Sequence, residues 1–161
     1  MMVDMLVKLY GNRNIDPADT FPEDSHIQIK QALSLDKEVI LDFVRSNFSA
    51  ASPGWVSECE SALMRLPTAC FIAEHKNKVV GFACYDATAK GFFGPMGVTE
   101  AHRRKGIGRA LMASVFRAMA HAGYGYAIIP WVSSTTYYRD AVGAIEIPAS
   151  EPGIYARRVG N

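Results

Sequence analysis

The stretch VTEAHRRKGIGR, residues 98–109, joins a predicted strand to a predicted helix and decides the fold of this chain. Before it, Phe92 to Val98 forms a short apolar run that is typical of a strand. After it, apolar residues recur every four positions from Ile107 to Met119, which predicts an amphipathic helix to about His121. A strand, a basic loop with glycines and a long helix therefore follow one another.

The loop has the features of an anion site. Gly106 and Gly108 carry no side chains that could shield the backbone, so several N–H groups can turn toward one point. The start of a helix adds roughly half a positive charge there. The loop contains one carboxylate, Glu100, and four cations: Arg103, Arg104, Lys105 and Arg109. With His102 neutral, the net charge of the loop is +3, whereas that of the whole chain is only +1.

Two known phosphate-binding motifs do not fit this loop. The Walker pattern GxxxxGK[ST] is absent, and Leu111 stands where a dinucleotide-binding fingerprint needs its third glycine. A bare GxG would indicate only a turn with solvated basic residues. The whole pattern, Val98-x4-Arg103-x2-Gly106-x-Gly108, favours the anion site instead.

This pattern resembles the signature of the GNAT superfamily of N-acetyltransferases, [RQ]-x-x-G-x-[GA] at the start of the central helix, and residues 103–108 match it fully. The similarity runs from Phe71 to about Gly143. It implies that the loop amides bind the pyrophosphate of coenzyme A, that the preceding strand pairs with the pantetheine arm, and that acetyl-CoA is the co-substrate with no metal. The cofactor-binding residues so implied are Met96, Gly97, Val98, Arg103, Arg104, Lys105, Gly106, Ile107, Gly108 and Arg109.

The rest of the chain predicts a mixed α/β fold with a largely antiparallel sheet. Ser34 is expected to cap one helix with Leu35, Val39, Ile40, Phe43 and Val44 on its apolar face, and Ser52-Pro53 to begin a second helix. The length fits one domain, 1–161, with residues 1–24 as an N-terminal strand and loop extension. Further strands are expected at 3–10, 26–32, 70–74, 79–87, 126–132 and 144–147, and a short helix at 135–142; the strands at 70–74 and 79–87 are expected to form a hairpin with a polar turn at 75–78.

The sheet is expected to open beside the loop. Gly94-Pro95 falls inside the strand at 92–98, where proline removes a ladder donor and glycine tolerates a bulge. A split between this strand and the strand at 126–132 would leave a slot for the strand-like pantetheine, as the resemblance also implies. The alternative is a kinked edge strand without function.

Tyr138 is the candidate general acid. A tyrosine with a pKa of about 10 remains protonated at pH 7 and can donate to a departing sulfur. Tyr138 lies in a stretch, residues 136–143, that resembles the family's F-Y-x(3–4)-G segment near the thioester, with Tyr137 in the place of phenylalanine. The alternative is that both tyrosines only pack a short helix.

The base and the acceptor site are less defined by the sequence. The strand at 92–98 has no carboxylate, so Glu74, Asp86, Asp140 or ordered water remain as routes for the amine proton. Aromatic residues near the expected slot are the candidate acceptor contacts: Phe48, Trp55, Tyr85, Phe92, Phe93 and Trp131.

Composition narrows the function classes. A net charge of +1 argues against nucleic-acid binding. The sequence has neither a secretory signal nor an apolar run of about 18 residues. A cytoplasmic protein without a membrane partner is therefore expected. Cys59, Cys70 and Cys84 lack the spacing of a zinc site and are expected to be buried and reduced.

The sequence therefore predicts transfer of an acetyl group from acetyl-CoA to a primary amine, by default that of a small molecule. A protein amine as acceptor stays open, and so does a non-catalytic acyl-CoA sensor that kept the loop and lost turnover. The length of the acyl donor and the formation of a homodimer also stay open.

Overall fold

The computed structural model describes residues 2–16 and 21–160 and contains two separate sheets. One has the order β2-β3-β4-β5 and is antiparallel throughout. The other has the order β6-β1-β7 and is also antiparallel. The strands are β1 (Val3–Lys8), β2 (Ile27–Gln31), β3 (Cys70–His75), β4 (Lys78–Tyr85), β5 (Phe93–Val98), β6 (Tyr126–Val132) and β7 (Ile145–Glu146).

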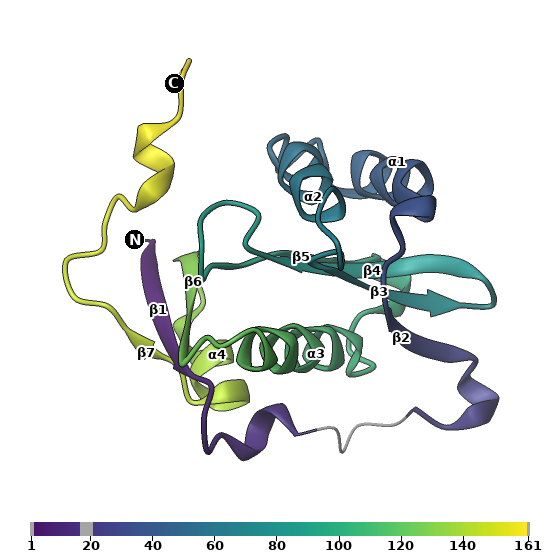
Figure 1. Ribbon diagram of the computed structural model, residues 1–161, viewed down its shortest axis with the longest axis horizontal. Helices are drawn as coiled ribbons and strands as arrows, with labels where there is room; N and C mark the ends of the chain where they lie inside the picture. Colours follow the sequence, from purple (N-terminus) through teal and green to yellow (C-terminus); the bar gives the residue numbers. More distant parts are fainter. Residues whose placement is uncertain (1, 17–20, 161) are drawn as a thin grey trace.

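Helices cover both faces of the four-stranded sheet (Figure 1). α1 (Lys37–Phe48) and α2 (Trp55–Leu63) lie on one face, and α3 (Ile107–His121) lies on the other. α4 (Thr135–Val142) follows β6 and ends at Gly143, whose φ of 70° suits a helix C-cap. The mixed α/β fold and the largely antiparallel sheet predicted from the sequence are confirmed.

The hairpin β3–β4 forms as predicted. Its two-residue turn, Lys76 and Asn77, has positive φ at both positions, 51° and 64°. Such turns match the twist of antiparallel strands and set their register. The turn pairs Glu74 with Val79, but a bulge between Ala73 and Glu74 shifts the register by one residue, so that Cys70 faces Cys84 across the pair.

The starts of α1 and α2 differ from the prediction. Ser34 opens a 3-10 turn instead of capping α1, and Asp36 occupies the N-cap position without a side-chain hydrogen bond. α2 begins only at Trp55, because Ser52 and Pro53 form a turn in which the Ser52 carbonyl accepts the Trp55 amide. The buried face of α1 changes accordingly: it consists of Ile40, Leu41 and Val44, while Leu35 and Val39 are exposed.

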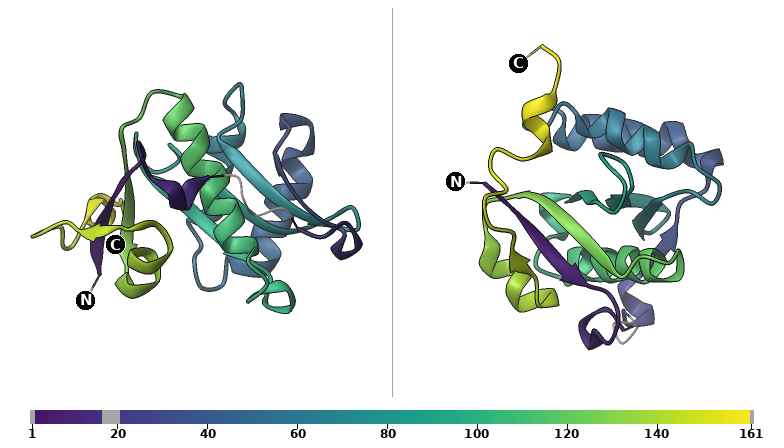
Figure 2. Two further views of the ribbon diagram at one scale, coloured as in Figure 1. Left: turned by 90° about the horizontal axis from the view of Figure 1, so that it is seen from below. Right: turned by 60° about the vertical axis from the view of Figure 1, so that its left-hand side comes forward.

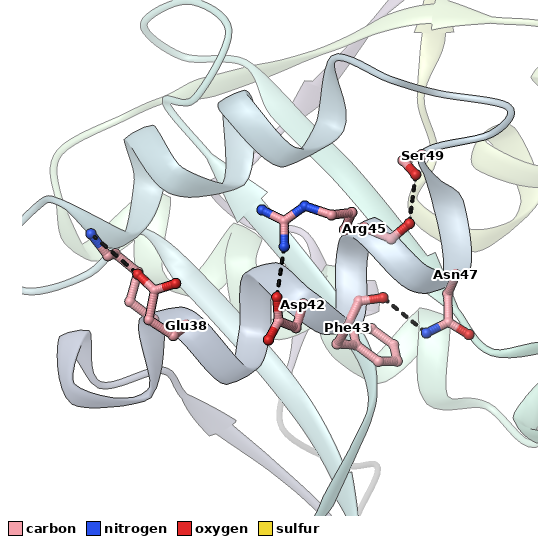
Figure 3. A network of polar contacts seen from close by, with 7 residues as sticks. Glu38, Asp42, Phe43, Arg45, Asn47 and Ser49 are labelled. Carbon is pink, nitrogen blue, oxygen red and sulfur yellow. Dashed lines mark hydrogen bonds and ion pairs between the residues drawn. The ribbon is translucent and has the colours of Figure 1, made fainter.

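The opposite face of α1 is polar and satisfies its own groups (Figure 3). Arg45 pairs with Asp42 one turn earlier at 2.6 Å, and the Asn47 amide donates to the Phe43 carbonyl. The Ser49 hydroxyl donates to the Arg45 carbonyl near the helix end. This solvated face leaves the apolar face of α1 for packing on the sheet.

The second sheet has an arrangement that the sequence did not indicate. β1 lies between β6 and β7, so residues expected as an N-terminal extension supply its central strand (Figure 2). β7 spans only two residues, fewer than expected for the last strand. Within the described ranges, no helix is both long and apolar enough to cross a membrane.

The split between the sheets is present as predicted. Among the described residues, β5 and β6 share no ladder, and a single parallel bridge joins Phe92, just before β5, to Ile128 of β6, next to the hydrogen bond from the Ile128 amide to the Gly91 carbonyl. The strands separate beyond this point and belong to different sheets.

Replacing Gly97 of β5 by alanine should destabilise the protein. A Cβ there would lie 2.6 Å from Cζ of Phe48, whose ring is held among Phe43, Trp55 and Phe82. We expect Gly97→Ala to lower the free energy of unfolding by about 1–3 kcal/mol, measured by urea denaturation. Gly125→Ala is the control, because nothing lies within 4 Å of its Cβ position. Equal urea midpoints for the two variants would contradict this packing.

Candidate active site

Both strands at the split carry a bulge. In β5, Met96 pairs with Ala83 but Phe93 pairs with Tyr85, so β5 has one residue more than β4 over this interval. The extra residue falls at Gly94-Pro95, as the sequence predicted. The bulge interrupts the ladder where β5 turns away from β6.

The bulge of β6 was not predicted. Val132 pairs with Val3 while Ile129 pairs with Met5, so the extra residue falls at Pro130-Trp131. Trp131 has a φ of 57°, and its amide donates to Asp4 Oδ1 at 2.9 Å. Asp4 of β1 therefore holds Trp131 in a conformation that the sequence of β6 alone did not indicate.

The loop after β5 presents a run of backbone donors. Arg104 and Gly106 have positive φ, 61° and 81°, on either side of Lys105. Such an alternation of backbone conformations turns successive N–H groups toward one side. None of the amides from Arg104 to Arg109 donates to an acceptor within residues 2–16 and 21–160.

The cations of this loop are available as well. The side chains of Arg103, Arg104, Lys105 and Arg109 are exposed, and no described carboxylate lies within ion-pair distance of them. Nε of Arg103 donates to the Val98 carbonyl at 3.0 Å, which ties the loop to the end of β5. Partnerless amides at a helix start, beside unpaired cations, fit a diphosphate.

Gly108 links this loop to the split. A Cβ at Gly108 would lie 3.8 Å from Oη of Tyr137, 3.9 Å from Cε of Met96 and 3.9 Å from a methyl group of Val98. Gly108 therefore faces β5 on one side and α4 on the other. The amide run opens onto the space between these two elements.

Met96, which lies beside Gly108, also lines a cavity of about 630 Å³ between β5, β6, the start of α2 and the C-terminal segment. Three of the aromatic residues expected to contact the acceptor line it: Trp55, Phe93 and Trp131. Phe48, Tyr85 and Phe92 are not among its lining residues. Phe48 packs over Gly97, Tyr85 lines another cavity beside Asp86, and Phe92 bridges to Ile128. Met96, Pro95 and Tyr138 also line the 630 Å³ cavity.

Tyr138 stands at the wall of this cavity with its hydroxyl available. Its Oη makes no hydrogen bond to any residue that the structure describes, although the side chain is half buried. Burial, and then the neighbouring Tyr137, raises the pKa of Tyr138 to about 12. The phenol therefore keeps its proton at any physiological pH and can donate it to a ligand.

The carboxylates considered as bases lie elsewhere. Asp86 accepts hydrogen bonds from the Gly91 amide and the Tyr124 hydroxyl, both at 2.7 Å, and so holds the β4–β5 turn. Glu74 pairs with Lys30 across β2 and β3. Neither these two nor Asp140 lines the cavity, whereas Glu58 of α2 does. Glu58 was not among the predicted site residues, because its position in the sequence of α2 indicates only a polar residue next to the apolar face of the helix.

A known protein family matches the part of the chain that contains this loop and the split. A family model for the Acetyltransferase (GNAT) family matches residues 37–143, which include β5, the loop and Tyr138. The chain belongs to the GNAT family. No curated protein matches the chain.

Solved structures share the GNAT fold with this chain at low sequence identity. A GCN5-related glucosamine N-acetyltransferase region of a fungal multi-domain GH3 β-N-acetylglucosaminidase has a TM-score of 0.71 at 14% identity, with 91% of this chain and 20% of that chain covered. A GCN5-related N-acetyltransferase from Sphaerobacter thermophilus has a TM-score of 0.68 at 23% identity, with 91% and 48% covered. This chain thus spans about a fifth and about half of their lengths.

A third GNAT structure comes from Brucella melitensis and was solved in complex with acetyl-CoA. Its TM-score is 0.58 at 18% identity, with 80% of this chain and 93% of that chain covered. The fold is therefore shared by proteins of the family with very different sequences. Acetyl transfer from acetyl-CoA is the general chemistry of GNAT proteins.

Three cysteines come together on the α2 side of the GNAT core. The sulfur atoms of Cys59, Cys70 and Cys84 all lie within 4.8 Å of one another, and each residue is buried and free of a disulfide. The three thiols are buried as predicted, but their convergence from α2, β3 and β4 was not visible in the sequence. Burial raises the pKa of the Cys84 thiol well above its usual value, whereas hydrogen bonds with Cys70 and then Cys84 lower the pKa of Cys59 to about 5.

A histidine pair beside the loop at 98–109 should make this GNAT domain sensitive to acid. His75 Nδ1 lies 3.3 Å from His102 Nε2, and partial burial followed by the charges of His102, Lys76 and Lys105 lowers the pKa of His75 below 6.5. A lowered pKa in the folded state means that stability is complete above pH 6.5 and is lost as the pH falls. We expect a lower melting temperature at pH 5 than at pH 7.5.

His75→Gln should reduce this acid-induced loss, because only one imidazole then remains to be charged. The control is His121→Gln, at the end of α3. Thermal melts across this pH range measure the effect, and an unchanged loss in His75→Gln would contradict it.

Proposed function

We propose that this protein is an acetyl-CoA-dependent N-acetyltransferase that acetylates a primary amine of a small molecule. The observation that supports this most strongly is the run of partnerless amides from Arg104 to Arg109 at the mouth of the split between β5 and β6. Amides and unpaired cations there would hold the pyrophosphate, and β5 from Met96 to Val98 would face the pantetheine arm. Acetyl-CoA, when bound, supplies an activated acetyl group as a thioester.

Tyr138 would act as the general acid. Its free hydroxyl lines the cavity in which the thioester end would lie, and it would donate its proton to the sulfur as the carbon–sulfur bond breaks. The burial that raises the pKa of Tyr138 would also raise the pKa of a thiol in the same site. The pKa of the proton donor and that of the proton acceptor would therefore rise together.

Tyr137 would contact the cofactor and would take no part in proton transfer. Its hydroxyl lies on the Gly108 side, 3.8 Å from the Cβ position there, and it does not line the 630 Å³ cavity. Both tyrosines line a smaller cavity of about 440 Å³ beside the end of β6, but only Tyr138 also lines the 630 Å³ cavity, and we assign the two residues different roles.

Amine-dependent release of free thiol from acetyl-CoA tests the proposal. A panel of primary amines is offered to the purified protein, thiol is followed with a colorimetric disulfide reagent, and products are identified by mass. The buried cysteines of the protein contribute little to the signal. Thiol release together with an N-acetylated product supports the function, and failure to bind acetyl-CoA in calorimetry overturns it.

A further inference from the structure

The 630 Å³ cavity contains two charged side chains of opposite sign, Glu58 and Arg158, among uncharged walls. Both approach the same point beside Gly54. A Cβ at Gly54 would lie 3.8 Å from Glu58 Oε1 and 4.0 Å from Arg158 Nη2. The two groups nevertheless form no ion pair in the part of the chain that the structure describes. They are close enough to bind one small ligand together and do not neutralise each other directly.

Glu58 is held by one of its two oxygens. The Thr88 hydroxyl donates to Oε2, and the Tyr155 hydroxyl donates to the same oxygen at 3.3 Å. Oε1 accepts no hydrogen bond from any described residue. The carboxylate is therefore fixed in orientation with one oxygen open to a donor in the cavity.

Arg158 is placed by the C-terminal segment. The 3-10 turn Ile154–Arg157 precedes it, and the Arg158 amide donates to the Tyr155 carbonyl at 3.2 Å. The ring of Tyr155 contacts the ring of Trp131 with 5.2 Å between centroids. This contact fastens the segment to the bulge of β6, so Arg158 stands at the cavity and not on a free tail.

The side chains that line the cavity indicate which chemical groups a ligand needs in order to bind there. A fixed carboxylate oxygen accepts from an amine, and a guanidinium binds a carboxylate with charge-assisted hydrogen bonds. The aromatic rings of Trp55, Phe93 and Trp131 offer an apolar surface for the rest of the molecule. An amine and a carboxylate on one small apolar body match all three features.

We propose that the acceptor is a primary amine that also carries a carboxylate, of the amino-acid type, with Glu58 Oε1 accepting a hydrogen bond from its amine and Arg158 binding its carboxylate. This inference rests on the proposed function. In the transfer, the amine nitrogen forms a bond to the acetyl carbonyl carbon while the carbon–sulfur bond breaks, and sulfur takes the electron pair and the Tyr138 proton. The ammonium loses two protons: one restores Tyr138, and the other leaves to solvent past Glu58.

Matched acceptors test the assignment. Leucine and phenylalanine are each compared with their carboxamide and with their decarboxylated amine, and kcat/KM is measured by thiol release. We expect the free acids to be preferred by about 10- to 100-fold, since a charge-assisted hydrogen bond is lost in the other forms. Arg158→Gln should abolish this preference. Arg157→Gln is the control, because Arg157 lines only the neighbouring cavity.

Glu58→Gln should raise KM for the amine by about tenfold with little change in acetyl-CoA affinity. The matched control is Glu60→Gln, on the same helix but exposed and beside Lys37. Equal rates for acids, amides and decarboxylated amines would overturn the inference while leaving the acetyltransferase function intact. A preference for the acids that survives Arg158→Gln would overturn the role of Arg158. No acetyl-CoA binding at all would overturn the proposed function itself.

Discussion

Gly108→Asp is expected to weaken acetyl-CoA binding by at least about 100-fold while the protein stays folded. The new carboxylate would stand beside the amides from Arg104 to Arg109, where a diphosphate would meet it at close range. Folding should be retained, because the nearest atoms to a Cβ at Gly108 lie at ordinary contact distance, 3.8 Å or more. An acidic residue in the first turn of a helix is also favourable.

Two variants separate charge from size at this position. Gly108→Asn has nearly the same shape as the aspartate without its charge, and Gly108→Ala adds only a methyl group. We expect alanine to bind acetyl-CoA almost normally and asparagine to fall between alanine and aspartate in calorimetric titrations. Undiminished affinity in Gly108→Asp, with a normal circular dichroism spectrum, would place the diphosphate elsewhere.

Tyr138→Phe is expected to lower kcat by about 100-fold and to change acetyl-CoA affinity by less than about threefold. The substitution removes a hydroxyl that has no partner among the described residues, so it should cost little stability. Because the pKa of Tyr138 is raised to about 12, loss of its proton should not reduce kcat of the unmodified protein at pH 7 to 9. Steady-state kinetics and calorimetry measure the two effects separately.

Tyr137→Phe is the matched control for this experiment. Tyr137 is adjacent in sequence and on the same helix, but its side chain faces Gly108 and is 45% exposed. We expect this variant to affect acetyl-CoA affinity more than kcat. If both variants slowed turnover equally, the general acid would not be Tyr138 alone.

The sequence by itself determined the elements that depend on local chemistry. The loop at 98–109 and the helix after it, the hairpin turn at Lys76-Asn77, and the bulge at Gly94-Pro95 all appear where the residues predicted them. Each depends on short-range causes: apolar periodicity, positive φ, or a missing backbone donor. The signature at 103–108 indicates the family for the same reason, since it consists of residues that are consecutive in the sequence.

Helix starts were less well determined. Ser34 and Ser52 are good capping residues, yet α1 and α2 each begin three residues after them. Capping contributes only about 1 kcal/mol, which the packing of α1 and α2 against the sheet can override.

Only the tertiary structure decided what lines the 630 Å³ cavity. Glu58, Tyr155 and Arg158 come from α2 and the C-terminal segment, and Asp4 of β1 fixes Trp131 across the second sheet. Contacts between residues about 100 positions apart leave no periodicity in the sequence, because they depend on how strands pair and where chain ends dock. The position of β1 between β6 and β7 is such a pairing, and it brings Asp4 to Trp131, which lines the cavity.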